Sequence, residues 1–146
     1  MKSNPVNLQS GVILIEALVA ILIFAIGILA LIGLQAAAIA NTAEAKYRSD
    51  AALLASQLIT RIWIDDKTKI ADYATGSVNA GNNIGLKAWM AEVEAALPQA
   101  TGANAPTVTV TSNAGGFDIV VTVSWQKPGQ PDKHKFVSAA RIDHNT

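Results

Sequence analysis

The sequence predicts an α+β fold in which the distal half of one long N-terminal helix packs on a small antiparallel sheet. Residues 12–34 form an almost unbroken apolar run, and no glycine or proline interrupts residues 35–74. These two patterns predict one helix from about Val12 to about Ile64. Residues 117–126 alternate apolar and polar side chains, which is typical of a strand with one buried face.

The apolar run is the dominant feature of the chain. A bilayer-spanning helix needs about 20 apolar residues, and in lipid the backbone has to satisfy its own hydrogen bonds as a helix. The run contains one charge, Glu16, and it follows a short polar segment with one lysine, Lys2. It is too long for the apolar region of a secretory signal peptide. An ionisable group in a membrane span is energetically costly, so its presence indicates a functional role. The alternative interpretation is an uncleaved signal anchor in which the Glu16 side chain reaches back to the membrane interface.

The segment Gly11-Val12-Ile13-Leu14-Ile15-Glu16-Ala17-Leu18-Val19-Ala20 resembles the class III signal of type IV pilins and type II secretion pseudopilins. Its continuation to Gln35 is similar to the start of the PilV-type minor pilins, although Val12 stands where that family usually has phenylalanine. The resemblance implies a pilin-like fold and cleavage by a prepilin peptidase between Gly11 and Val12. It also implies N-methylation of the new Val12 amine, which Glu16 of a neighbouring subunit then neutralises during assembly.

The resemblance divides the chain into a cleaved leader at 1–11, the membrane-spanning and assembly half of the helix at 12–40, and a periplasmic globular domain at 41–146. It implies a minor pilin that initiates or modifies a type IV pilus. The implied location is the bacterial inner membrane, crossed once, and the pilus after assembly. The implied partners are other minor pilins, the major pilin, the prepilin peptidase and the inner membrane. The same features fit a minor pseudopilin of the I class from a type II secretion system, and neighbouring genes would separate the two.

Two glycines, Gly27 and Gly33, interrupt the apolar run. Glycine in a helix interior costs up to about 1 kcal/mol relative to alanine. The positions fit local flexibility of the helix when it leaves the lipid. They fit equally well a close helix–helix contact through small residues, since Gly33 and Ala37 are four apart.

The remaining elements follow from periodicity and from turn residues. The distal helix carries an apolar stripe, and a short helix is expected from Leu86 to Leu97, ended by Pro98. Strands are expected over 107–111, 117–126 and 135–142, with a hairpin at 113–116 and a longer turn at 127–132. The residues 65–69 are expected to form a solvated helix end or turn, the alternative being a cation site or catalytic pair at Asp65 and Asp66, and 76–85 are expected to form a loop. The stripe consists of Tyr47, Ala51, Leu54, Leu58 and Ile62.

The composition favours a structural protein over an enzyme. The 146 residues include 11 basic and 11 acidic ones, so no basic excess indicates a nucleic-acid partner. There is no cysteine, which excludes disulfides and thiolate metal sites. His134 and His144 lack the spacing of a helical zinc site, no serine lies in a nucleophile elbow, and the three tryptophans fall on expected core faces. We therefore expect no catalytic residue, metal, cofactor or small-molecule substrate. A membrane-anchored binding module is a further alternative, which an aromatic-rich C-terminal loop would favour.

Overall fold

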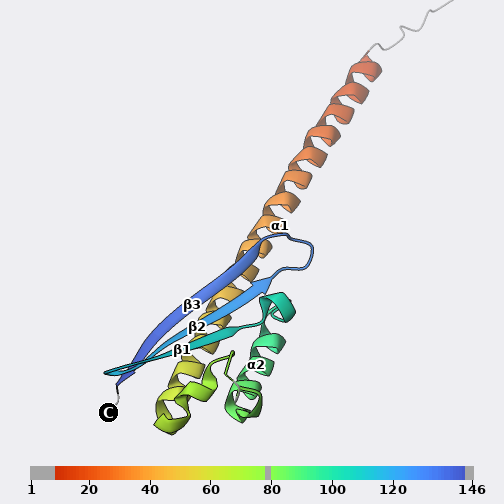
Figure 1. Ribbon diagram of the computed structural model, residues 1–146. Helices are drawn as coiled ribbons and strands as arrows, with labels where there is room; N and C mark the ends of the chain where they lie inside the picture. The colour runs from red at the N-terminus through yellow and green to blue at the C-terminus, as the bar shows by residue number, and fades with distance from the viewer. Residues whose placement is uncertain (1–8, 78–79, 144–146) are drawn as a thin grey trace, which may run out of the picture. The chain divides into compact units, whose positions relative to one another are not determined.

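The helix α1, Gln9–Ile64, is the longest element of the computed structural model, which describes residues 9–77 and 80–143. The chain divides into two compact units, Met1–Ala43 and Glu44–Thr146. α1 begins three residues before the expected Val12, because Gln9 and Ser10 include no proline that would stop the helix from extending. Its C-terminal end at Ile64 agrees with the sequence. Figure 1 shows the order of the elements along the chain.

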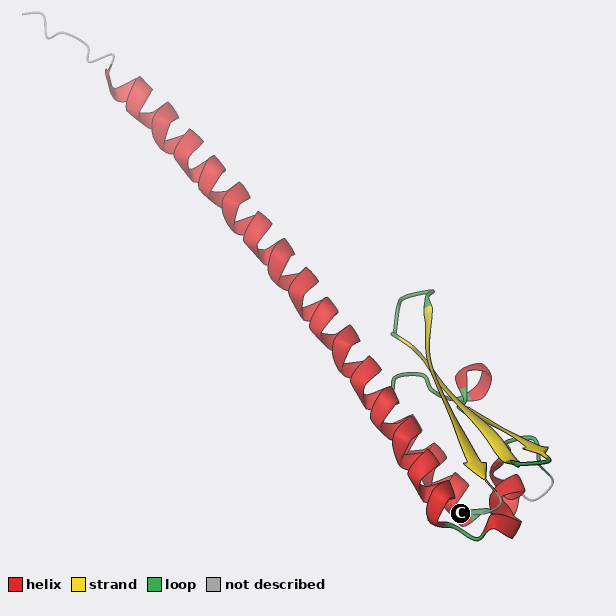
Figure 2. Cartoon of the chain, turned by 90° about the vertical axis from the view of Figure 1, so that its left-hand side faces the viewer, coloured by secondary structure: helices red, strands yellow, loops and turns green. Residues whose placement is uncertain are grey.

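The second unit contains the distal part of α1, the helix α2 and one three-stranded sheet (Figure 2). α2 spans Ile84–Ala96, and the strands are β1, Thr107–Asn113, β2, Gly116–Gln126, and β3, Lys133–Asp143. The strands are antiparallel in the order β1-β2-β3. This arrangement confirms the α+β fold class and the small antiparallel sheet.

One apolar core joins α1, α2 and the sheet within the second unit. Four of the five residues of the expected helix stripe are buried, and Tyr47 packs against them partly buried. The inner face of β2 supplies Ile119, Val121, Val123 and Trp125, all fully buried, as the alternation in the sequence predicts. The period of two in β2 and the four-residue spacing in α1 therefore place their apolar faces against the same core.

Two short 3-10 helices occupy segments for which the sequence predicts turn and loop. The first, η1, spans Lys67–Tyr73, and Asp66 caps it by accepting a hydrogen bond from the backbone N–H of Thr68 at 2.9 Å. Ile70 is buried in this helix, although no apolar period in the sequence marks it. The second, η2, spans Ala80–Asn82, and a third, η3, Gly102–Asn104, precedes β1. The side chain of Asn83 caps α2, which explains why α2 starts two residues before Leu86.

The tryptophans do not all lie in the core. Trp89 and Trp125 are buried, but Trp63 is 52% exposed, so the expectation that all three lie on core faces is wrong for Trp63. Trp63 directly follows the buried Ile62 in α1, and adjacent residues of a helix point about 100° apart. The stripe that buries Ile62 therefore turns Trp63 away from the core.

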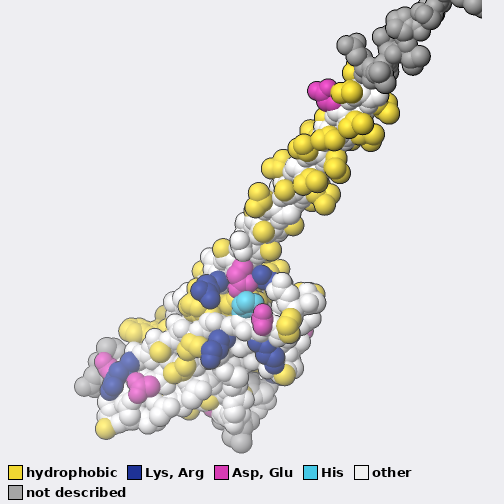
Figure 3. Space-filling view, turned by 90° about the horizontal axis from the view of Figure 1, so that it is seen from above, with side chains coloured by type: hydrophobic (Ala, Val, Ile, Leu, Met, Phe, Trp, Pro, Cys, Tyr) yellow, Lys and Arg dark blue, Asp and Glu magenta, His cyan; other side chains and the backbone are white. Residues whose placement is uncertain are grey.

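A single carboxylate, Glu44, ties the turn between β2 and β3 to α1. Its two oxygens lie 2.7 Å from Lys127 Nζ and 3.0 Å from His134 Nδ1. The imidazole of His134 stacks on Trp125 at a centroid distance of 5.7 Å. Figure 3 shows acidic and basic side chains gathered around a histidine on one face of the second unit. The hydrogen bond from Lys127 is the largest cause of a lowered pKa of Glu44, and the charges of His134, Lys127 and Arg48 lower it further.

The lowered pKa of Glu44 predicts an acid-dependent contribution to stability. A carboxyl group whose pKa is lower in the folded state stabilises that state fully above its unfolded pKa, near 4.5, and loses the contribution as the pH falls further. We expect Glu44→Gln to lower the unfolding free energy at pH 7 by about 1 kcal/mol, as for a partly exposed ion pair. The difference should shrink below pH 4.5. Thermal unfolding in detergent, followed by circular dichroism at pH 7 and below pH 4.5, measures the loss of unfolding free energy and its dependence on pH. Glu94→Gln, at an exposed position, is the control.

Candidate assembly site at the start of α1

The Gly11–Val12 peptide bond lies in the first turn of α1, two residues after the helix begins at Gln9. Gly11 is exposed, and a Cβ atom placed on it meets no other atom within 4 Å. The first turn of a helix holds unbonded backbone N–H groups, and acidic residues there stabilise it, but this turn has none. Its backbone is therefore among the easiest of the helix to open.

Glu16 lies one helical turn after Val12, so the two residues share a face of α1. Its side chain is exposed, and no ion pair within the described residues involves it. It is the only acidic residue in α1 before Glu44. Figure 3 shows that apolar side chains dominate the N-terminal part of the helix. If lipid or other protein chains cover this part of the helix, a cation close to the carboxylate would stabilise it strongly.

The apolar part of α1 exposes its side chains on all sides. Large residues from Val12 to Ile39 are 42–74% exposed, and the helix includes an 18-residue window with a mean hydropathy of 3.0. A helix that is apolar all round requires cover from lipid or from other protein chains. By length and composition, this helix is sufficient to cross a membrane.

Gly27 and Gly33 lie within unbroken helix. A Cβ atom at either position meets no other atom within 4 Å, so neither glycine is required by a contact inside the chain. Flexibility of the helix and close packing against another helix both remain predictions for these two positions.

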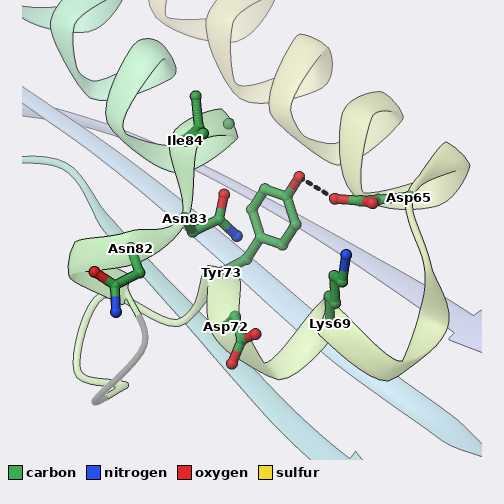
Figure 4. Close-up of a pocket in the computed structure, with 8 residues that line it drawn as sticks. Asp65, Lys69, Asp72, Tyr73, Asn82, Asn83 and Ile84 are labelled. Atoms are coloured by element: carbon green, nitrogen blue, oxygen red, sulfur yellow. Dashed lines mark hydrogen bonds between the residues drawn. The ribbon is translucent and has the colours of Figure 1, made fainter.

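The second unit has a shallow cavity of about 440 Å³ beside η1 and the start of α2 (Figure 4). Three of its polar side chains are already hydrogen-bonded: the Tyr73 hydroxyl donates to Asp65 Oδ2 at 2.6 Å, and Asn83 Oδ1 accepts from the backbone N–H of Leu86. Burial, together with this bond to Asp65, raises the pKa of Tyr73 to about 12. The same bond, with one from the backbone N–H of Asp66, lowers the pKa of Asp65. Asp65 and Tyr73 therefore fasten η1 to the end of α1, which is a structural role.

No cluster of metal-binding side chains is found among the residues that the structure describes. They include no group of three or more histidine, cysteine, aspartate or glutamate side chains that could hold a metal ion. His134 contacts the carboxylate of Glu44, and His144 lies outside the described residues. Sequence reasoning gave Glu44 no role, although it is the first charged residue after Glu16, and that isolation was the available signal.

The structure thus keeps the sequence-predicted residues Gly11, Val12 and Glu16 together on the first turns of one exposed helix. Searches against protein-family models, curated protein sequences and solved structures find no match to this chain.

Proposed function

We propose that this chain is a minor pilin of a type IV pilus system that acts in initiating or modifying the filament. The observation that carries the proposal is the Glu16 carboxylate, which forms no ion pair with the described residues and lies one turn after Val12 on the exposed apolar part of α1. A lone acid would be a cost for a helix that only anchors a domain in lipid. It is useful where a parallel neighbour presents an amine at the same depth.

The proposed mechanism is a charge pair between subunits. A prepilin peptidase removes residues 1–11, and the amine of Val12 becomes a cation at the end of the apolar helix. Glu16 of a neighbouring parallel helix, staggered along the axis, neutralises it. Each charge alone is unfavourable in a low-dielectric layer, so pairing fixes the axial register between the two helices. The major pilin and other minor pilins are the proposed neighbours. The inner membrane holds the subunit before assembly, with the second unit in the periplasm, and the protein has no enzymatic step of its own.

Processing after Gly11 is the first test of this proposal. We expect the mature protein to start at Val12 and to carry one N-methyl group, because a small residue before the cut fits the peptidase and a bulky residue does not. Mass spectrometry of the protein from the native membrane measures the start and the methyl group. Gly11→Leu should accumulate uncleaved protein, while Gly11→Ala should be partly processed. An intact N-terminus in the wild type would identify an uncleaved anchor and contradict the proposal.

A further inference from the structure

The two edge strands of the sheet, β1 and β3, differ in whether another segment of the chain bonds to their outer side. The outer edge of β1 is closed by Thr75: its backbone N–H donates to Val108 O at 3.0 Å, and Val108 N–H donates to Thr75 Oγ1 at 3.3 Å. η1 also lies against β1. β3 pairs with β2 on one side, and no strand among the described residues pairs with its other side. Figure 1 shows β3 as the outermost strand.

The register identifies which backbone groups of β3 point outward. Val108 directs its N–H and C=O toward Thr75 and therefore away from β2. The ladder is continuous and pairs Val108 with Val121 and Val121 with Ser138. In an antiparallel ladder the bonded side alternates from residue to residue. It follows that Val121 and Ser138 bond each other, and that the neighbours of Ser138 in β3 point their N–H and C=O groups outward.

A second contact agrees with this alternation. The backbone N–H of Gln126 donates to Pro98 O at 3.1 Å, so this even-numbered residue of β2 points away from β3. Its partner in β3 is Lys133, whose N–H and C=O then lie on the open side. At the middle of the strand, Val137 and Ala139 are exposed and form no hydrogen bond beyond the β-ladder.

An open edge of this kind is a template for another strand. β3 is 11 residues long, pairs with β2 without a bulge and contains no proline, and residues 136–140 carry no charge. Soluble proteins usually blunt a long open edge with a bulge, a proline, a charge or a covering loop, as Thr75 does for β1. We propose that the outer edge of β3 binds an extended, acid-flanked segment of a partner protein as a fourth strand.

Charge selects this partner over a second copy of the chain. Lys133, Lys135 and Arg141 lie on the exposed face of β3, and the one acid there, Asp143, is already paired with Arg141 at 3.2 Å. Two antiparallel β3 strands in full overlap would place Lys135 of each copy opposite Arg141 of the other, which is repulsive, and Lys133 opposite Asp143, which is attractive. Self-pairing therefore has no net gain from charge, whereas a partner strand with acids opposite Lys135 and Arg141 gains two attractive pairs.

The test uses the full chain in detergent and two synthetic peptides as long as β3. Both peptides alternate threonine and valine; one has aspartates opposite Lys135 and Arg141, and the other has lysines there. Addition of the acidic peptide should protect the Val137 and Ala139 amides from hydrogen exchange, because these N–H groups gain acceptors. The Ser138 amide, already bonded to β2, is the internal reference. The lysine peptide should bind about tenfold more weakly or worse.

A matched pair of variants separates edge pairing from side-chain effects. Ala139→Pro removes an outward N–H without breaking a bond to β2, and proline is tolerated at such edge positions. It should weaken acidic peptide binding about tenfold, since it removes a hydrogen bond and blocks close approach. Ala139→Ser keeps the N–H and should bind like the wild type. Circular dichroism confirms that both variants are folded.

Three outcomes would overturn the proposal. The first is no protection of Val137 and Ala139 at millimolar acidic peptide. The second is equal binding of the two peptides or of the two variants. The third is self-association of the unliganded chain that Ala139→Pro abolishes in analytical ultracentrifugation, because a second copy would then occupy the edge. The proposal stands independently of processing after Gly11.

Discussion

Glu16→Leu is expected to leave the protein in the membrane and to remove it from the assembled filament. Leucine fits lipid at least as well as a carboxylate does, so the amount in the membrane fraction should not fall. The substitution removes the carboxylate that pairs with the N-terminal amine of a neighbouring subunit. Removing one member of a buried charge pair costs about 3 to 5 kcal/mol, enough to reduce occupancy of a site in the assembly by two orders of magnitude or more.

The measurement is a pair of immunoblots, one of the membrane fraction and one of sheared filaments with their co-purifying minor pilins. Gln35→Leu is the matched control, because Gln35 is the next polar residue of α1 and the substitution makes the same apolar change away from the N-terminus. Glu16→Asp keeps the charge and should restore part of the assembly. If Glu16→Leu enters filaments at the wild-type level, the carboxylate does not set the register between subunits.

The elements with a strong period were predictable from the sequence. The stripe in α1 places Leu54 and Leu58 in the core because residues four apart share a helix face. The alternation in β2 buries Ile119 and Val123 because alternate residues of a strand share one face of the sheet. Boundaries moved by one to three residues, and at the start of α2 the shift comes from the cap that Asn83 provides.

What the sequence did not predict depends on contacts between segments that are distant in the chain. The burial of Ile70 in η1 comes from packing in the second unit, and η1 is too short to carry a helical period. The pairing of Glu44 with Lys127 and His134 joins residues more than 80 positions apart, and no local pattern encodes it. The open edge of β3 likewise follows from the strand order, which needs the structure.

The candidate assembly site was predictable for a different reason. Gly11, Val12 and Glu16 lie within two turns of one helix, so their spacing in the sequence sets their spacing on its surface. The structure adds that Glu16 has no cation among the described residues. The assembly experiment tests whether a neighbouring subunit supplies that cation.

Trp89→Ala is expected to destabilise the second unit more than other single substitutions in its core. Trp89 is 1% exposed, and its Nε1–H donates to Leu54 O of α1 at 2.8 Å, so its side chain fastens α2 to α1 by packing and by a hydrogen bond. Truncating a buried tryptophan to alanine costs about 3 to 5 kcal/mol, because it loses buried area and leaves a cavity. That is a large fraction of the 5 to 15 kcal/mol typical of whole domains.

Urea unfolding of the full chain in detergent, followed by circular dichroism, measures this loss. Trp63→Ala is the matched control, since Trp63 is 52% exposed and its removal should cost less than about 1 kcal/mol. Trp89→Phe keeps most of the ring volume and removes the hydrogen bond. Its loss of unfolding free energy is therefore expected to lie between those of Trp89→Ala and Trp63→Ala. Equal costs for Trp89→Ala and Trp63→Ala would show that α2 does not pack on α1 through Trp89. That result would contradict the core that joins α1, α2 and the sheet.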